Sequence, residues 1–141
     1  MPHQIVLDTN VLVAALRSRR GASFKLLSLL TSGRFEINLS NALLFEYEDV
    51  LMRQYQALSL TSRDIATVLD FLCGIANLHE VYFLWRPSLR DPRDEMILEL
   101  AVSASCRYIV TYNKRDFVGV ERFGIKVVDA REFLLILQAS S

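Results

Sequence analysis

Short apolar runs alternate along the chain with segments whose apolar residues recur at helical spacing. The apolar runs predict strands at residues 4–7, 35–39, 80–85, 108–111 and 126–128. Helical spacing predicts helices at residues 10–16, 23–30, 41–53, 61–76, 91–105 and from 129 onward. Strands that alternate with helices are typical of a mostly parallel sheet covered by helices on both faces. The pattern therefore predicts a single α/β domain over residues 1–141, with about five strands.

Several helix boundaries carry a local signal in the sequence. Ser40 and Asp91 stand where an N-cap is favoured, and a proline follows Asp91 at the first helical position. Thr61 and Asp64 have the spacing of a capping box. Gly33 predicts the end of the second helix, because it tolerates left-handed backbone. The longest expected loops are then residues 54–63 and 86–93.

Four acidic residues fall where a fold gains little stability from a charge. Asp8 ends the first apolar run, Asp116 follows the fourth, Asp94 opens an amphipathic segment and Glu46 lies in a mostly apolar helix. Residues that follow the first and fourth strands of such a sheet are expected to lie side by side at its carboxyl edge. One like-charged pair about 4 Å apart costs about 4 kcal/mol at an effective dielectric near 20. A cluster of these carboxylates would therefore imply a bound Mg²⁺ or Mn²⁺, since both ions prefer oxygen ligands.

Each carboxylate also has a structural interpretation that the sequence leaves open. Asp8 could cap the first helix, and Asp94 could interact with the dipole of its own helix. Asp116 could belong to a turn, and Glu46 could be a solvated helix residue. Asp91 is explained best as an N-cap. Four separate caps and turns need not converge, so the positions of these oxygens in space decide between the interpretations.

Composition narrows the function only a little. The 16 basic and 16 acidic residues give a net charge of zero, so only their distribution can indicate a nucleic-acid partner. A hydrophobic fraction of 52% predicts a homodimer, a larger oligomer or a tight complex. The chain has neither an apolar run of roughly 18 residues nor a signal-peptide pattern, so we expect a cytoplasmic protein. Cys73 and Cys106 are predicted to be buried, reduced thiols, and His3 and His79 to be structural.

Four pieces of sequence, taken in order, resemble the PIN-domain nucleases. They are residues 6–12 (VLDTNVL), Glu46, residues 91–94 (DPRD) with the helix that follows, and residues 109–117 (IVTYNKRDF). Together they cover about residues 4–129. The 91–94 piece and the long helical middle are most similar to the PIN group that includes toxin components of bacterial and archaeal toxin–antitoxin systems. The resemblance implies a three-layer α/β/α fold and Mg²⁺- or Mn²⁺-dependent cleavage of single-stranded RNA.

The resemblance also implies roles for individual residues. The catalytic and metal-binding positions of the family map onto Asp8, Glu46, Asp94 and Asp116. Positions that would orient carboxylates or water by hydrogen bonds map onto Thr9, Thr111 and Asn113. Many relatives carry Asp where Asn113 stands, so metal affinity is expected to be modest. Glu95 is assigned no role beyond the helix dipole. The implied partners are RNA and a cognate antitoxin protein.

Basic residues close to the acidic pieces could engage RNA phosphates. They are Arg17, Arg19, Arg20, Arg86, Arg90, Arg93, Lys114 and Arg115, of which Arg17, Arg93, Lys114 and Arg115 are the predicted substrate-binding set. A solvated surface is the alternative interpretation. Tyr112 could stack on a base or serve packing, and the sequence leaves both open.

Other classes with acidic strand ends fit less well. A receiver module needs an acidic pair after the first strand, a haloacid-dehalogenase-like phosphatase needs Asp where Asn10 stands, and a glycine-rich phosphate loop is missing. Two alternatives inside the PIN resemblance stay open. One is a non-catalytic module that binds RNA or protein, and the other is a nuclease of RNA processing outside toxin–antitoxin systems.

Overall fold

A computed structural model describes residues 2–81 and 89–140. The strands are β1 (His3–Leu7), β2 (Phe35–Ser40), β3 (Asn77–His79), β4 (Tyr108–Val110) and β5 (Lys126–Val128). The α-helices are α1 (Thr9–Arg17), α2 (Ala22–Ser28), α3 (Asn41–Gln54), α4 (Ser62–Ile75), α5 (Pro92–Ser103) and α6 (Ala130–Ala139). Two 3-10 helices, η1 (Lys114–Phe117) and η2 (Val120–Phe123), lie between β4 and β5. The predicted α/β class is confirmed.

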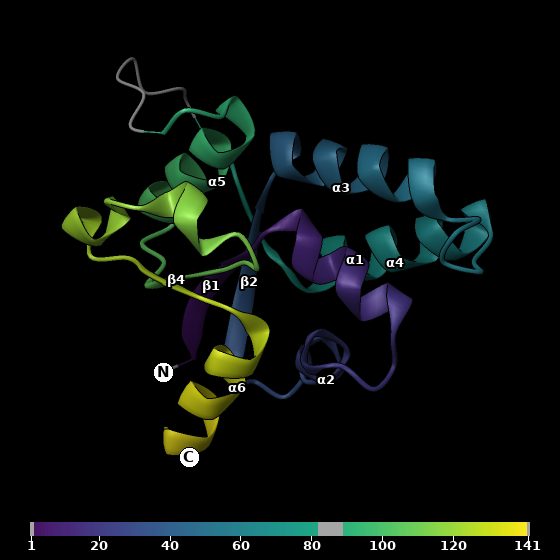
Figure 1. The fold of residues 1–141 in the computed structure, drawn as a ribbon, viewed down its shortest axis with the longest axis horizontal. Coiled ribbons are helices and arrows are strands. Elements are labelled where there is room, and N and C mark those ends of the chain that lie inside the picture. The colour runs from purple at the N-terminus through teal and green to yellow at the C-terminus, as the bar shows by residue number, and fades with distance from the viewer. Residues whose placement is uncertain (1, 82–88, 141) are drawn as a thin grey trace.

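The five strands form one parallel sheet in the order β3-β2-β1-β4-β5. Figure 1 labels its three central strands, β4, β1 and β2. As predicted, β1 and β4 are neighbours, with Leu7 opposite Val110. The chain steps outward from β1 through β2 to β3 and then returns to β4 on the other side of β1. Since parallel crossovers are right-handed, α5 lies on the sheet face opposite α1 and α2. The change of direction opens a crevice at the carboxyl ends of β1 and β4.

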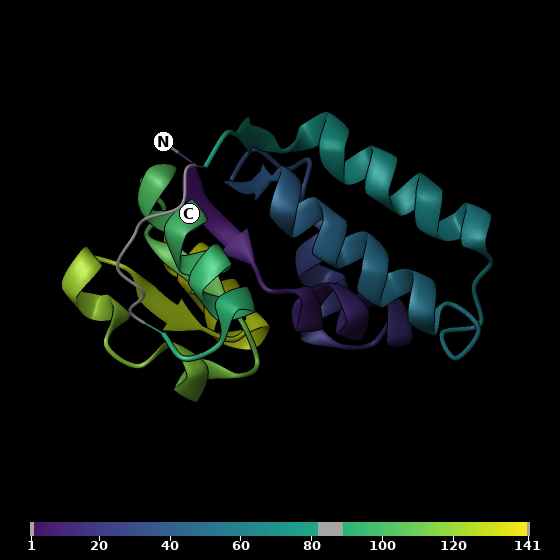
Figure 2. The same ribbon diagram turned by 90° about the horizontal axis from the view of Figure 1, so that it is seen from above.

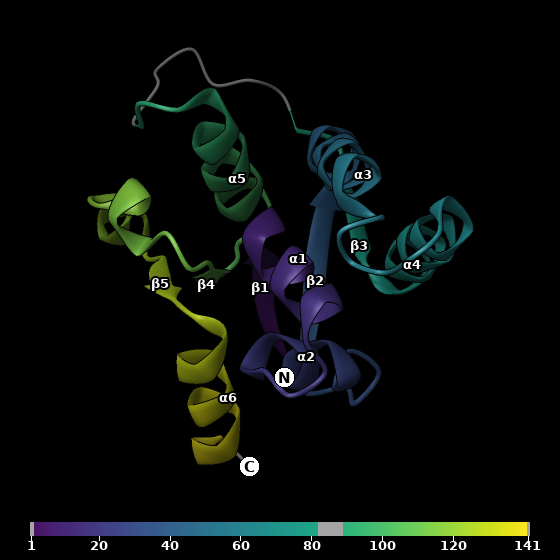
Figure 3. The same cartoon turned by 45° about the vertical axis from the view of Figure 1, so that its right-hand side comes forward.

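The core lies on both faces of the central strands. Ile5, Val6 and Leu7 are all fully buried, as expected for a parallel strand covered on each side. α5 packs across β1, β2 and β4, while α1 and α6 both contact α2. α3 and α4 pack side by side and extend away from the sheet (Figure 2). Figure 3 shows this pair at the β2 and β3 side, away from β5.

The third strand lies earlier than the sequence pattern predicts. It is Asn77–His79 rather than 80–85, and residues 82–85 lie outside the described part of the chain. Directly after α4 the chain pairs with β2, where Asn77 lies opposite Asn38. The side chains of His79 and Asn38 are joined by a 2.7 Å hydrogen bond. A strand stabilised by polar side chains has no apolar run, which is why the pattern missed it.

Capping signals set the helix starts as predicted. The Ser40 hydroxyl accepts a hydrogen bond from a backbone N–H of α3 at 3.2 Å, and Thr61 and Asp64 form the capping box of α4. Gly33 adopts the left-handed conformation expected of it, but α2 already ends at Ser28. Apart from β3, the observed bounds of the predicted elements lie within two residues of those expected.

The residues predicted to be structural are mostly placed as expected. Cys106 is buried and burial raises the pKa of its thiol to about 12, whereas Cys73 is only half-buried. Both cysteines are free thiols. His3 and His79 lie in strands and make side-chain hydrogen bonds. None of the described helices is long and apolar enough to cross a membrane.

Candidate active site

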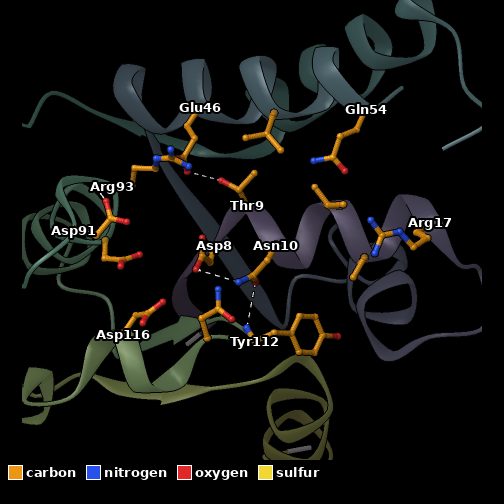
Figure 4. A pocket seen from close by; sticks show the side chains of 15 residues that line it. Asp8, Thr9, Asn10, Arg17, Glu46, Gln54, Asp91, Arg93, Tyr112 and Asp116 are labelled. Carbon is orange, nitrogen blue, oxygen red and sulfur yellow. Dashed lines mark hydrogen bonds and ion pairs between the residues drawn. The ribbon is translucent and has the colours of Figure 1, made fainter. Parts of the chain in front are cut away.

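A pocket of about 480 Å³ opens at the carboxyl ends of β1 and β4 (Figure 4). All four predicted carboxylates line it, although they come from well-separated parts of the chain. Its polar lining residues are Asp8, Thr9, Asn10, Arg17, Glu46, Gln54, Asp91, Arg93, Asp94, Tyr112, Asn113 and Asp116. The sheet topology therefore gathers the acidic pieces into one cavity.

Asp8 follows β1 at the first turn of α1, but its carboxylate makes no capping hydrogen bond. Its Oδ2 instead accepts from the Thr111 hydroxyl at 2.7 Å and from the Asn10 amide at 3.4 Å. Burial raises the pKa of Asp8, the charges of Glu46 and Asp116 raise it further, and the Thr111 hydrogen bond opposes them. The side-chain capping interpretation of Asp8 was therefore wrong.

Glu46 is held in the pocket by the attachment of α3 to β1. The buried hydroxyl of the next residue, Tyr47, donates to the backbone oxygen of Leu7 at 2.5 Å. Glu46 Oε2 accepts from the Thr9 hydroxyl at 2.6 Å, and its Oε1 lies 3.9 Å from Arg93 Nε. Because its side chain is only 14% exposed, Glu46 is not the solvated helix residue that the sequence also allowed.

Three further aspartates lie at the start of α5 and on η1. Asp91 caps α5 by accepting from the backbone N–H of Arg93 at 2.9 Å, as predicted, yet it also lines the pocket. Burial raises the pKa of Asp94 to about 6, and the charges of Asp91, Asp8, Asp116 and Glu46 contribute in that order. A carboxylate that acted only on its own helix dipole would be favoured in its charged form. The raised pKa instead reflects the burial of Asp94 in the first place and the like charges around it in the second.

Thr111 joins the elements that carry the carboxylates. Besides donating to Asp8, its hydroxyl accepts from the backbone N–H of Asn113 at 3.0 Å and from the Asn10 amide at 3.2 Å. Asn10 also accepts from the backbone N–H of Tyr112 at 3.2 Å. Sequence reasoning gave Asn10 no role. The available signal was its position two residues after the strand-end aspartate, within reach of that carboxylate.

The predicted basic residues differ in whether they line a pocket. Arg17 and Arg93 line the carboxylate pocket. Arg115 lines an adjoining pocket of about 480 Å³ with Arg90, and this second pocket shares Asp91, Asp94 and Asp116 with the first. Lys114, Arg19 and Arg20 line neither pocket, and Arg86 lies outside the described residues.

Two individual interpretations change with the structure. Lys114 forms an ion pair with Glu132 at 2.8 Å, so its charge is already matched away from the pocket. Glu95 does more than act on a helix dipole, because its Oε2 accepts from the backbone N–H of Leu89 at 2.6 Å. Glu95 thereby ties the segment before α5 to the first turn of that helix.

The pocket donors suit a hard divalent cation in type. Mg²⁺ and Mn²⁺ prefer the carboxylate and amide oxygens that Asp8, Glu46, Asp94, Asp116 and Asn113 provide. No hydrogen bond or ion pair joins the side chains of Asp94 and Asp116 to another described residue. Within residues 2–81 and 89–140, no three Asp, Glu, His or Cys side chains already lie close enough to hold one ion together. The pocket therefore presents suitable ligands without a preformed three-ligand cage.

Comparison with known protein families decides which family this fold and pocket represent. The model of the PIN domain matches residues 4–115, which is most of the chain. The chain belongs to the PIN domain family. PIN domains are generally nucleases, and they generally use divalent metal ions. The resemblance seen in the sequence is thus confirmed at the level of the family.

This PIN domain is also similar to a protein of known structure. One chain in the crystal structure of VapBC2 from Rickettsia felis, bound to a DNA fragment from their promoter, matches it with a TM-score of 0.60. The two chains are 15% identical, and the match covers 89% of this chain and 98% of that one. At this identity the likeness is one of fold. Comparison with curated proteins gave no match.

Proposed function

We propose that this PIN domain is a Mg²⁺- or Mn²⁺-dependent endoribonuclease that hydrolyses phosphodiester bonds of single-stranded RNA. The observation that carries the proposal is the meeting of Asp8, Glu46, Asp94 and Asp116 in one pocket at the topological switch point. The pKa of Asp94, raised to about 6 by burial and then by the charges of neighbouring carboxylates, supports a partly desolvated anionic site. Such a site is typical of functional clefts rather than of surface ion pairs.

The proposed roles follow from the contacts of each residue. Asp8, Asp94 and Asp116 would hold a cation, and Glu46 would complete its surroundings directly or through water. A bound divalent ion would offset charge on the reacting phosphate and lower the pKa of water. Thr111 fixes the Asp8 carboxylate, and Thr9 fixes that of Glu46. These hydroxyls would hold the carboxylates in place for an incoming ion.

The arginines that line the pockets would bind the phosphates of the substrate. Arg17 and Arg93 line one pocket, Arg90 and Arg115 line the other, and the two pockets share Asp91, Asp94 and Asp116. Guanidinium groups pair well with phosphate oxygens. A polyanionic strand that lay across both pockets would meet positive charge in each of them, as well as the shared carboxylates. This arrangement suits internal cleavage of a strand longer than the site.

Cleavage of a single-stranded RNA by the purified protein tests the proposal. The parent should cleave with Mn²⁺ or Mg²⁺ and stop when chelator is added. Asp8→Asn should keep the fold and lose at least about 100-fold in rate, because it removes a proposed metal ligand. Asp70→Asn, on the exposed face of α4, is the matched control and should cleave like the parent. Undiminished cleavage by Asp8→Asn would refute the assignment.

We further propose that the chain is the toxin of a toxin–antitoxin pair with an antitoxin partner, and that it forms an oligomer. Support comes from the fold shared with a chain of the VapBC2 crystal structure and from the hydrophobic composition. Expression of the chain alone should then arrest growth, and co-expression with a neighbouring antitoxin gene should relieve the arrest. An RNA-processing nuclease would cause no such arrest.

A non-catalytic binding module is the second candidate. It is favoured by the absence of a preformed three-ligand cage among the described residues and by Asn113, which adds no charge to the site. Calorimetry with Mn²⁺ distinguishes the two candidates. Heat of binding that Asp8→Asn abolishes supports the nuclease, whereas no binding at millimolar Mn²⁺ supports the module.

A further inference from the structure

Tyr112 places an aromatic ring at the wall of the carboxylate pocket (Figure 4). It is the one aromatic side chain among the described residues that line this pocket, which is otherwise lined mainly by charged and small groups. The residue is 45% exposed, although it directly follows the fully buried Thr111. The ring is thus presented to the cavity instead of being folded into the core.

Two hydrogen bonds hold Tyr112 at opposite ends. Its hydroxyl and the buried Ser23 hydroxyl of α2 are 2.5 Å apart. Its backbone N–H donates to the side chain of Asn10, which in turn contacts the carboxylate of Asp8. The ring is therefore fixed relative to the proposed metal ligand. A side chain already held in place loses little conformational freedom when a ligand binds.

The exposed part of the ring is suited to a flat, uncharged group. The hydroxyl of Tyr112 already has a partner in Ser23, so the open surface that remains is largely the apolar ring. A phosphate would gain little from that surface, whereas a nucleobase stacked on an aromatic ring gains affinity whatever its identity. Arg17 lines the same pocket and could contact the backbone of the same strand.

We propose that Tyr112 is a stacking platform for one nucleobase beside the scissile phosphate, which restricts the substrate to strands with an unpaired base at that position. A base inside a duplex is stacked on both sides and has no free face for the ring. Tyr112 therefore selects single strands and contributes no preference for base identity. This inference rests on the proposed nuclease function, because it places the base next to the carboxylates.

Fluorescence anisotropy of labelled decaribonucleotides tests the platform. All measurements use Asp8→Asn, so that cleavage does not consume the probe, and compare a mixed-sequence strand with strands that carry one abasic residue at each position in turn. In this background Tyr112→Leu removes the ring, Tyr112→Phe keeps the ring but removes the bond to Ser23, and Phe123→Leu is the control. Phe123 is 44% exposed, nearly the same exposed fraction as that of Tyr112, and it does not line the pocket.

The expected result depends on both the base and the ring. Tyr112→Leu should weaken binding of the complete strand about 5- to 100-fold, Tyr112→Phe by only about 2- to 5-fold, and Phe123→Leu not at all. In the protein that retains Tyr112, an abasic residue at one position should weaken binding by a similar factor. The Tyr112→Leu protein should bind this abasic strand as well as it binds the complete strand. When the complementary strand is annealed, the protein that retains Tyr112 and the Tyr112→Leu protein should bind with equal affinity.

Two other results would overturn the platform. An equal loss for Tyr112→Leu on the complete strand and on every one of the abasic strands would show a structural role, and no loss on the complete strand would show that the base lies elsewhere. In either case cleavage by the parent with Mn²⁺ would leave the nuclease proposal intact. If the parent neither binds nor cleaves any strand, the nuclease proposal itself fails.

Discussion

The hydroxyl group of Thr111 makes three of the hydrogen bonds that order the pocket. It is completely buried and contacts the Asp8 carboxylate, the Asn10 amide and the backbone N–H of Asn113. Donor and acceptor capacity are both used, so a residue without the hydroxyl leaves several polar groups without that partner. The strand-end threonine is thus as important to the position of Asp8 as the strand itself.

Thr111→Val keeps the shape of this side chain and removes only its hydrogen bonds. We expect the free energy of unfolding to fall by about 1–3 kcal/mol, because buried polar groups lose a partner. Mn²⁺ affinity should fall about 10- to 100-fold, since Asp8 is no longer held. Urea unfolding and calorimetry measure the two effects. Thr67→Val is the control, because its hydroxyl contacts only the Arg63 carbonyl on the exposed side of α4; equal effects of the two variants would contradict the expectation.

The raised pKa of Asp94 makes a prediction about pH. Its pKa of about 6 lies above the usual 3.8, so between about pH 4 and 6 the folded protein holds a proton that the unfolded chain releases. In chelator, the contribution of this group to stability should therefore rise as pH falls from 7 to 5. Asp94→Asn mimics the neutral form, so its Tm should exceed that of the parent at pH 7.

The comparison across pH isolates this group from other carboxyls. The Tm difference between Asp94→Asn and the parent should shrink as pH falls through about 6, because the parent then becomes neutral at the same position. Differential scanning fluorimetry in chelator at pH 5 and 7 measures it. A difference that stays constant with pH would show that neither burial nor the neighbouring charges destabilise the charged form of Asp94.

Among the elements, α3 is attached to the sheet at the point where Glu46 must be placed. Tyr47→Phe removes the buried bond to the Leu7 carbonyl, so we expect a loss of about 1–3 kcal/mol in stability and weaker Mn²⁺ binding. Thr61→Ala, which removes the N-cap of α4, should cost a similar ~1 kcal/mol without changing Mn²⁺ binding. Urea unfolding and calorimetry compare the pair. Equal Mn²⁺ affinities would show that this attachment does not position Glu46.

Elements with a local chemical signal could be predicted from the sequence, and the one without it could not. Ser40 and the Thr61–Asp64 pair fix helix starts through side-chain bonds to nearby backbone, which sequence spacing reveals. β3 depends on the pairing of Asn77 and His79 with a strand far away in the chain. Polar residues at those positions carry no strand signal, so only the tertiary contact defines the element.

In the pocket too, the sequence predicts what local patterns set and misses what tertiary contacts set. Asp8 and Asp116 follow apolar strands, and a parallel topology is enough to bring them together. Asp91 was explained by its local role as a cap, which hid its place in the pocket. Lys114 was predicted to bind RNA because of its neighbours in sequence, and the structure pairs it with Glu132 of α6, a contact that the sequence did not indicate. That pairing requires the chain to fold back from β5.

At the scale of the whole molecule, charge is balanced overall and uneven locally. RNA binding would then depend on a few arginines rather than on a general basic surface. If Arg17, Arg93 and Arg115 each contact one phosphate, log K for the Asp8→Asn protein should fall with log salt with a slope near −2, about 0.7 for each contact. Replacing any one of them with Gln should reduce the slope by about 0.7.

Anisotropy of a labelled single strand between roughly 50 and 200 mM salt measures these slopes. Lys114→Gln is the internal control and should leave the slope unchanged, because Glu132 already neutralises that ammonium group. A reduced slope for Lys114→Gln, or unchanged slopes for all three arginine variants, would place the phosphate contacts elsewhere on the protein.

The register of β1 against β4 has a consequence for synthesis. Leu7 pairs with Val110, so during translation the first strand waits for a partner segment that is made much later in the chain. A prematurely terminated polypeptide that stops before residue 111 carries Asp8 and Glu46, but it has neither the hydroxyl that holds Asp8 nor the aspartate of η1. Under the proposed nuclease function, such truncated products lack two groups of the active site and are expected to be inactive.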